Sequence, residues 1–219
     1  MIPHLKKELS KKSIQSDRIW MEGYMRHLFP FYGVKSQPRK EIVKTSLKQF
    51  PIQSKGELIT ILEKLWNEKK REFHHVAMDL GERYHKLFEA DSLSFFEVMI
   101  RKNSWWDSID RIAPTLVGLL LQKYPELLPE MDRWIEDENM WIRRSALIYQ
   151  LKYKEKTDKE RLFSFCKSRM HEEEFFIRKA IGWVLRQYAR TNPESVREFI
   201  EKNRSELSSL SFREASKYL

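Results

Sequence analysis

Hydrophobic residues recur along most of the chain at intervals of three and four, which places them on one face of an α-helix. The alternating pattern and the hairpin dipeptides typical of β-strands do not occur, and breakers are few, with 6 glycines and 8 prolines in 219 residues. The pattern therefore predicts an all-α protein. The expected helices span residues 4–12, 16–29, 38–49, 55–68, 72–88, 91–102, 104–123, 126–136, 139–154, 158–169, 173–190, 193–206 and 209–218.

Several of these helix starts carry residues that suit a first turn. Ser54, Asp91 and Asp158 are expected to act as N-caps, because their side-chain oxygens can accept hydrogen bonds from otherwise unsatisfied backbone N–H groups. Pro38 and Pro193 suit the first helical turn, where a missing N–H costs nothing.

An internal repeat underlies the helical pattern. Similar segments begin at Trp106, Trp141 and Phe176, a spacing of 35 residues (141 − 106 and 176 − 141), and an earlier echo begins at Phe73. Each segment is predicted to open the second helix of a pair. A period of this length built from two helices is typical of a HEAT-like helical-repeat solenoid. We therefore expect one domain over residues 1–219, with equivalent helices facing a concave basic groove.

The helix that follows Ser104 carries candidate chemistry. Helical phasing places Trp105 on its apolar stripe, Asp107 and Arg111 opposite in solvent, and Trp106 and Asp110 together on the shoulder. A carboxylate held against an indole is partly desolvated, and it then interacts more strongly with positive charge than it would in water. The alternative is that the tryptophans are core residues and Asp110 is a capping or salt-bridged residue.

Two later helices add aromatic and cationic side chains. Trp183 lies off the apolar face of its helix, beside Lys179 and Arg186, an arrangement suited to contacting a base or sugar while cations hold phosphate. The alternative is that Trp183 packs on a neighbouring repeat. Phasing does not separate Arg143 from Arg144, since both flank the apolar face of their helix, and the alternative for these is two solvated arginines.

Composition narrows the function further. The chain has 41 Lys+Arg against 32 Asp+Glu, a net charge of +9, which favours a polyanionic partner such as nucleic acid. The single cysteine, Cys166, lies in an apolar run and is expected in the core. No phosphate-binding glycine loop or paired cysteines occur, and the adjacent His74 and His75 cannot share a helix face, so no metal or cofactor is expected.

The start of the chain lacks the apolar segment of a signal peptide, and no stretch approaches the roughly 18 apolar residues of a membrane span. We therefore expect a cytoplasmic protein with no membrane association.

Taken in order, the motifs closely resemble the AlkD-like DNA alkylation repair family, whose members are helical-repeat alkylpurine DNA glycosylases. The resemblance rests on Ser104–Asp110, Trp141–Ala146, Gln150–Lys154 and Phe175–Arg186, and extends to Arg71–Phe73 and Leu210–Ala215. It implies that Asp110 is the catalytic aspartate, that Trp106 and Trp183 are the active-site tryptophans, and that Arg144 grips the DNA backbone.

The chain departs from the family near its start. The family has a glycine, an aliphatic residue, two further residues and a proline, whereas Gly33–Pro38 has three residues between Val34 and the proline. Tyr24 and Lys35 are assigned to DNA contacts in this region. With Arg144, the remaining candidates for DNA binding are Arg143, Lys179 and Arg186.

The resemblance implies hydrolysis of the N-glycosidic bond of cationic N3- and N7-alkylated purines in duplex DNA, such as 3-methyladenine and 7-methylguanine. The resemblance further implies that the reaction leaves an abasic site for base excision repair, without base flipping, and that the enzyme is a monomer. It also implies a bacterial protein that is associated with the nucleoid when it acts on DNA. An alternative is a non-catalytic helical-repeat scaffold that binds DNA or protein. An RNA-binding repeat protein fits less well, because the repeats lack the variation expected of a base-reading code.

Overall fold

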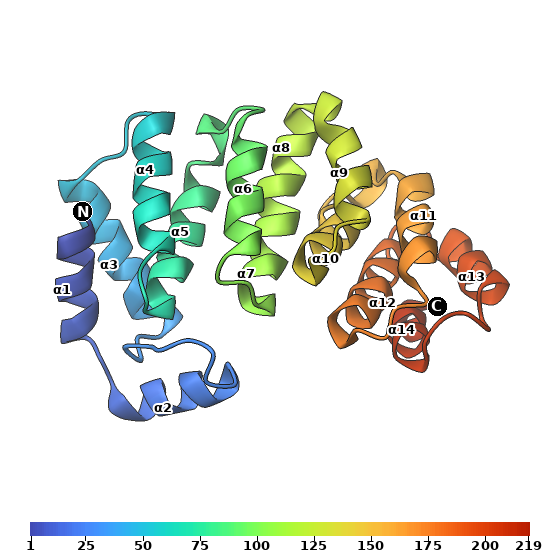
Figure 1. Ribbon diagram of the computed structural model, residues 1–219, viewed down its shortest axis with the longest axis horizontal. Coiled ribbons are helices and arrows are strands. Elements are labelled where there is room, and N and C mark those ends of the chain that lie inside the picture. The colour runs from blue at the N-terminus through green and yellow to red at the C-terminus, as the bar shows by residue number, and fades with distance from the viewer. The chain divides into compact units, whose positions relative to one another are not determined.

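Every element of the protein is helical, and most helices are joined by short loops, whereas a longer irregular segment covers residues 25–35 (Figure 1). The computed structural model describes residues 1–219 and contains no β-strand. The predicted all-α class is therefore confirmed. By internal contacts the chain divides into two compact units, Met1–Phe88 and Glu89–Leu219. That the two form one functional domain stays a prediction.

In the first unit, α1 packs on α3 and α4, and both of these pack on α5. Leucines of α1 and α4 fill its core together with Phe73 of α5, and all of them are fully buried. α2 contributes no buried residue. The elements are α1 (Ile2–Lys11), α2 (Gln15–Tyr24), α3 (Ser36–Gln49), α4 (Lys55–Trp66), α5 (Arg71–Arg83) and the 3₁₀ turn η1 (His85–Leu87).

The second unit consists of helix pairs. Its elements are α6 (Ser92–Arg101), α7 (Trp106–Arg111), the π-helical η2 (Ile112–Val117), α8 (Gly118–Lys123), η3 (Pro125–Leu127), α9 (Leu128–Ile135), α10 (Met140–Ile148), η4 (Lys154–Lys156), α11 (Lys159–Arg169), α12 (Phe175–Ala189), α13 (Pro193–Lys202), α14 (Ser209–Ala215) and η5 (Ser216–Tyr218). The second helices of the pairs contact one another in order, because α10 packs on α7 and α12, and α12 packs on α14. This is the arrangement of a helical repeat.

The predicted helix over residues 104–123 is not continuous. It begins at Trp106 and changes to a π-helix at Ile112–Val117 before α8 resumes the α-helix. Pro114 explains the interruption, because it lacks the N–H that would bond to the carbonyl of Asp110, and its ring would collide with that carbonyl. Asp110 therefore lies in the last turn of α7, directly before the π-helical segment.

The predicted helix starts are largely confirmed. Ser54 accepts a hydrogen bond from the N–H of Glu57, Asp158 accepts one from the N–H of Arg161, and Pro193 opens α13. Asp91 precedes α6 without a side-chain capping hydrogen bond.

Several predicted helix ends are too late. The helix predicted over 139–154 ends at Ile148, the one over 16–29 ends at Tyr24, and the one over 193–206 ends at Lys202. Arg26 lies in the left-handed region two residues after Tyr24, and such a conformation cannot continue an α-helix.

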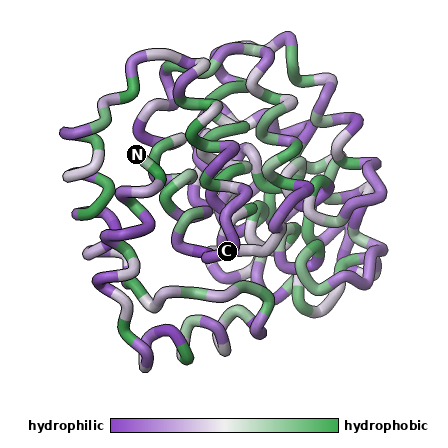
Figure 2. The backbone as a smooth tube through the Cα atoms, turned by 60° about the vertical axis from the view of Figure 1, so that its left-hand side comes forward, coloured by the Kyte–Doolittle hydropathy of each residue, from purple (hydrophilic) through white to green (hydrophobic).

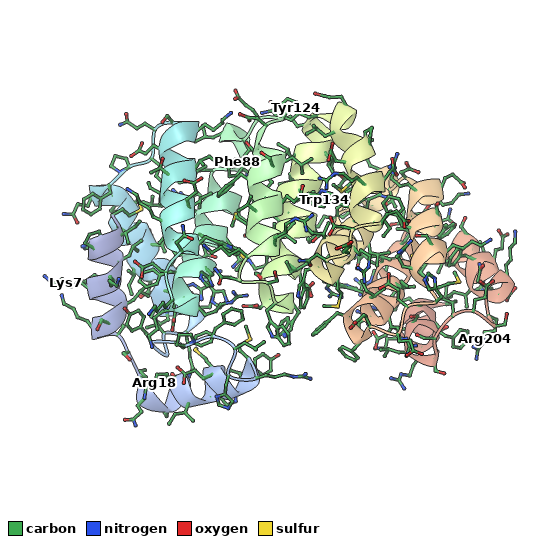
Figure 3. All side chains as sticks on the ribbon, viewed as in Figure 1. Lys7, Arg18, Phe88, Tyr124, Trp134 and Arg204 are labelled. Atoms are coloured by element: carbon green, nitrogen blue, oxygen red, sulfur yellow. The ribbon has the colours of Figure 1, made fainter.

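The helices are amphipathic, so hydrophilic and hydrophobic stretches alternate along the backbone (Figure 2). Trp134 of α9 is fully buried inside the second unit, whereas Lys7 of α1 extends into solvent (Figure 3). Cys166 is completely buried, as predicted, and burial raises the pKa of its thiol far above the ordinary value. No helix is long and apolar enough to cross a membrane.

Candidate functional site

Asp110 and Trp106 lie one turn apart on α7, as the sequence pattern predicts. Trp105 is the N-cap residue with an extended backbone, so the helix starts one residue later than its apolar stripe suggested. Trp106 is half-buried, and the Asp110 side chain is 20% exposed. Asp107 and Arg111, which were expected in solvent, are also half-buried. The carboxylate of Asp110 is therefore partly desolvated but still reachable from solvent.

Arg144 of α10 holds this carboxylate. Its Nε donates to Oδ1 and its Nη2 donates to Oδ2 of Asp110, each at 2.9 Å, which is the bidentate geometry of a strong charge-assisted pair. The third nitrogen, Nη1, donates to the backbone carbonyl of Phe176 in α12. Arg144 is 4% exposed, and it ties three successive second helices of the repeat together at Asp110.

The electrostatic environment of Asp110 has two opposing parts. Burial raises the pKa of the carboxyl, and the Arg144 guanidinium lowers it, while Asp107 adds a smaller upward contribution. Burial prevails, so the pKa of Asp110 lies above its ordinary value. When burial raises the pKa of a carboxyl group, a nearby cation stabilises its ionised form strongly.

Three aromatic rings pack against one another beside Arg144. Trp105 contacts Trp141 and Phe176 with ring centroids 5.7 and 5.3 Å apart, and Trp141 and Phe176 lie 4.9 Å apart. The Arg144 guanidinium lies 5.8 Å from the Phe176 ring. Trp141 and Phe176 occupy the repeat position of α10 and α12, but their packing partner from α7 is Trp105, the residue before the repeat position Trp106. Trp105 thus packs against other aromatic rings, as its place on the apolar stripe predicts, although its side chain is only half-buried.

Trp183 lies on α12 and is half-buried. The residue before it, Gly182, faces α14 so closely that a Cβ atom there would lie 2.6 Å from the Cβ of Glu214 and 2.9 Å from the carbonyl oxygen of Ser211. Only glycine allows α14 to approach α12 in this way. The contact with α14 therefore fixes the side of α12 from which Trp183 projects.

Lys179 and Arg186, the cations beside Trp183, both pair with one carboxylate. The Nζ of Lys179 lies 3.2 Å from Oε1 of Glu214, and Nη1 of Arg186 lies 2.5 Å from Oε2. Lys217 adds a third cation at 2.9 Å from Oε1. The Glu214 side chain is 8% exposed, and hydrogen bonds from Lys217 and Lys179 lower its pKa to about 2.

Arg143 is neither solvated nor directed to the Asp110 carboxylate. Its Nε and Nη2 donate to the two carboxylate oxygens of Glu172 at 2.9 and 2.7 Å, and its Nη1 donates to the carbonyls of Asp137 and Glu138. Arg144 is not solvated either. These contacts join the loop before α10 to the loop before α12, so the alternative of two solvated arginines is wrong for both residues.

Tyr24 and Lys35 belong to the first unit. Tyr24 is 57% exposed and stacks on Trp20, which is 64% exposed, with ring centroids 5.1 Å apart at an interplanar angle of 9°. Lys35 pairs with Asp17 at 2.9 Å. Two exposed, parallel aromatic rings on α2 form a flat apolar surface.

The loop that leads to Lys35 is firmly held, although it departs from the family pattern. Buried Glu72 accepts hydrogen bonds from the backbone N–H groups of Tyr32, Gly33 and Val34 at 2.9 to 3.1 Å. Gly33 has a φ of 88°, and a Cβ atom there would lie 2.2 Å from the carbonyl oxygen of Ile14. Glycine is thus required by both backbone conformation and space.

Sequence reasoning missed two parts of the site. One is the role of Glu214, for which the only signal was its place in the Leu210–Ala215 motif, and the other is the carbonyl of Phe176 as a partner of Arg144. No group of three or more His, Cys, Asp or Glu side chains is placed to hold a metal ion.

Comparisons with known proteins agree with this description. Residues 5–219 match the family model described as DNA alkylation repair enzyme. A predicted DNA alkylation repair enzyme from Enterococcus faecalis is similar in structure, with a TM-score of 0.88 and 34% identity over 95% of this chain and 97% of that one. Among curated proteins, none matches the chain.

More distant structures share the fold. AlkD2 from Streptococcus mutans has a TM-score of 0.63 and 18% identity, over 82% of this chain and 89% of that one. The protein smu.31 from Streptococcus mutans UA159 has a TM-score of 0.64 and 17% identity, over 82% and 92%. The match to the family model spans nearly the whole sequence, and it confirms the resemblance drawn from the motifs. The chain belongs to the DNA alkylation repair enzyme family.

Proposed function

We propose that the protein hydrolyses the N-glycosidic bond of cationic N3- and N7-alkylated purines in duplex DNA and leaves an abasic site. The observation that carries this proposal is the placement of Asp110, a partly desolvated carboxylate fixed by Arg144 and lying one helical turn from Trp106. A single oriented carboxylate is what this reaction requires, because an alkylated purine already carries positive charge and leaves without a general acid.

The reaction balances with water as the only co-reactant. The electron pair of the glycosidic bond moves to the purine, which departs as a neutral base, and the sugar becomes oxocarbenium-like. The carboxylate of Asp110 stabilises that positive charge and orients a water molecule. The water oxygen bonds to the anomeric carbon, and its proton passes to Asp110 and then to solvent.

Asp110 can act while it is paired with Arg144. Each carboxylate oxygen has two acceptor positions, and Arg144 occupies one on each oxygen. The other positions remain for water and for the developing charge of the sugar. Holding the carboxylate in one orientation before substrate arrives reduces the reorganisation that the transition state demands.

Trp106 and Trp183 would border the deoxyribose and present their ring faces to the cationic base and sugar. We propose that Arg144 serves first as the positioning residue for Asp110. The family resemblance also assigns Arg144 to a DNA phosphate. Two of its five N–H donors are not used by Asp110 or Phe176, but its side chain is only 4% exposed, so this contact requires the phosphate to lie directly against the Asp110–Arg144 pair. Arg143, Lys179, Arg186, Tyr24 and Lys35 are the further proposed DNA contacts.

The family resemblance supports a lesion that stays stacked in the duplex while the protein grips the backbone, and a monomeric enzyme. Incubating the purified protein with a methylated duplex tests the activity, with released bases and abasic sites measured separately. We expect free 7-methylguanine and 3-methyladenine, with one abasic site for each base. Duplex binding with no base release would instead support the alternative, a non-catalytic scaffold.

A further inference from the structure

Three cations on α12 and η5 converge on a single carboxylate of α14. Lys179 and Lys217 both contact Oε1 of Glu214, and Arg186 contacts Oε2. One negative charge faces three positive charges, so the group carries a net charge of +2 (3 − 1). We call Lys179, Arg186, Lys217 and Glu214 the α12–α14 cluster. Such a surplus around a nearly buried carboxylate favours binding of a further anion.

The cations of the α12–α14 cluster keep donors for that anion. Each ammonium group has three N–H donors and the guanidinium has five, and the pairing with Glu214 uses only part of them. The side chains of Lys179, Arg186 and Lys217 are 37%, 25% and 47% exposed, so their unused donors can reach solvent. Glu214 therefore holds the three cations close together while leaving some of their N–H donors unused.

The cluster lies beside a proposed active-site residue. Lys179, Gly182 and Arg186 are spaced so that they line the side of α12 facing α14, and Trp183 follows Gly182 directly. The missing side chain at position 182 lets Glu214 come close enough to reach both cations. A ligand that contacts Trp183 would thus meet the cluster on the same helix.

We propose that the α12–α14 cluster is a phosphate-binding site, in which Glu214 positions Lys179, Arg186 and Lys217 to grip the backbone of duplex DNA next to Trp183. This adds Lys217 as a DNA contact and Glu214 as a positioning residue, and it rests on the proposed action on DNA. Phosphate is the ligand that fits, because it offers several acceptor oxygens to converging cationic donors.

The first experiment measures the affinity for an undamaged duplex over a range of salt concentrations. Loss of one phosphate contact makes the slope of log affinity against log salt shallower by about 0.9. We expect that change for Lys217→Ala. Lys202→Ala is the matched control, because Lys202 is an exposed lysine on α13 and makes no contact with Glu214. Equal slopes for the two variants would overturn the phosphate assignment of Lys217.

The second experiment tests Glu214 by a double-mutant cycle with Glu214→Gln and Lys217→Ala. If Glu214 positions Lys217, removing the lysine costs less affinity in the Glu214→Gln background than in the wild type, so the two effects are not additive. A purely structural carboxylate would lower the stability but leave the fold-loss caused by Lys217→Ala unchanged. Additive losses would overturn the positioning role.

A third measurement uses the wild-type protein, so it does not depend on how the variants fold. Reductive methylation of lysine amines is compared with and without the undamaged duplex. We expect the duplex to protect Lys179 and Lys217 and to leave Lys202 reactive, and equal reactivity of Lys217 and Lys202 would contradict the proposal. None of these measurements requires base release. Their outcome therefore tests the phosphate-binding role of the α12–α14 cluster separately from the proposed glycosylase activity.

Discussion

Arg144 donates two hydrogen bonds to Asp110 from a helix that lies 34 residues further along the chain. Because Arg144 is almost fully buried, the pair is a fixed part of the interior and not a surface ion pair. Its partner Asp110 remains one-fifth exposed, so the arginine lies beneath the carboxylate and leaves the carboxylate open to solvent. This is the arrangement expected of a positioned catalytic group.

Arg144→Gln should shift the acid limb of the activity profile to higher pH. The guanidinium lowers the pKa of Asp110 against the effect of burial, so its removal raises that pKa further. The reaction needs the carboxylate form, which is lost as pH falls through the pKa. The single-turnover rate of 7-methylguanine release, measured against pH, gives the shift. Arg143→Gln is the control, since Arg143 pairs with Glu172. An equal shift of the acid limb in Arg143→Gln would show that the Arg144 guanidinium is not its cause.

Gly182→Ala should destabilise the protein by about 1–3 kcal/mol, because the added methyl group collides with Glu214 and Ser211. Urea denaturation measures the loss. Gly23→Ala on α2 meets nothing within 4 Å, so it should raise the helical stability of that segment by about 0.5–1 kcal/mol. The same substitution thus has opposite signs at the two sites. Unchanged or increased stability of Gly182→Ala would contradict the close approach of α14 to α12.

Glu214 should make the free energy of unfolding depend on pH in the acid range. Its pKa in the folded protein is about 2, below the ordinary 4.5, so its contribution to the free energy of unfolding is complete above about pH 4.5. That contribution is lost as pH falls from about 4.5 to 2. Measured by urea denaturation, the free energy of unfolding of Glu214→Gln should therefore fall less between about pH 4.5 and 2 than that of the wild type. Glu201→Gln, at an exposed position of α13, should keep the wild-type decline.

Substrate choice should follow charge on the base. Two indole faces and a carboxylate favour a cation, and desolvated cation–π contacts contribute about 0.5–2 kcal/mol each. We expect 7-methylguanine to be released on the order of 10- to 1000-fold faster than uracil or 1,N6-ethenoadenine in the same duplex. Efficient release of either neutral base would show that a recognition pocket, and not charge, governs the choice.

The sequence was sufficient where the relevant geometry is local. The placement of Trp106 and Asp110 on one helix follows from their spacing of four residues, and the repeat of Trp141 and Phe176 follows from a constant period. The interruption of this helix at Pro114 also had a sequence signal, because proline removes an N–H at a known position.

Contacts between repeats could not be predicted from the sequence. The pairing of Arg144 with Asp110 and of Arg143 with Glu172 depends on how neighbouring helices are stacked, and helical phasing alone did not distinguish the two arginines. Glu214 likewise meets Lys179 and Arg186 only because Gly182 admits α14, and that approach is a property of the packed pair of helices.

Asp110 is the residue whose carboxylate we propose performs the chemistry. Asp110→Asn should reduce 7-methylguanine release by about 10²–10³-fold, the usual loss when one electrostatic stabiliser of a transition state is removed. The change also leaves buried Arg144 with a poorer partner, so stability will fall. Glu172→Gln weakens a comparable buried pair with Arg143 and serves as the control for that loss.

The most direct test is the single-turnover release of 7-methylguanine from methylated duplex by the wild type, Asp110→Asn, Asp107→Asn and Glu172→Gln, with each variant shown to be folded by circular dichroism at the assay temperature. We predict that only Asp110→Asn loses the activity, while it still binds the duplex. An equal loss in Asp107→Asn or Glu172→Gln, or near-normal release by Asp110→Asn, would contradict the assignment of Asp110 as the catalytic carboxylate.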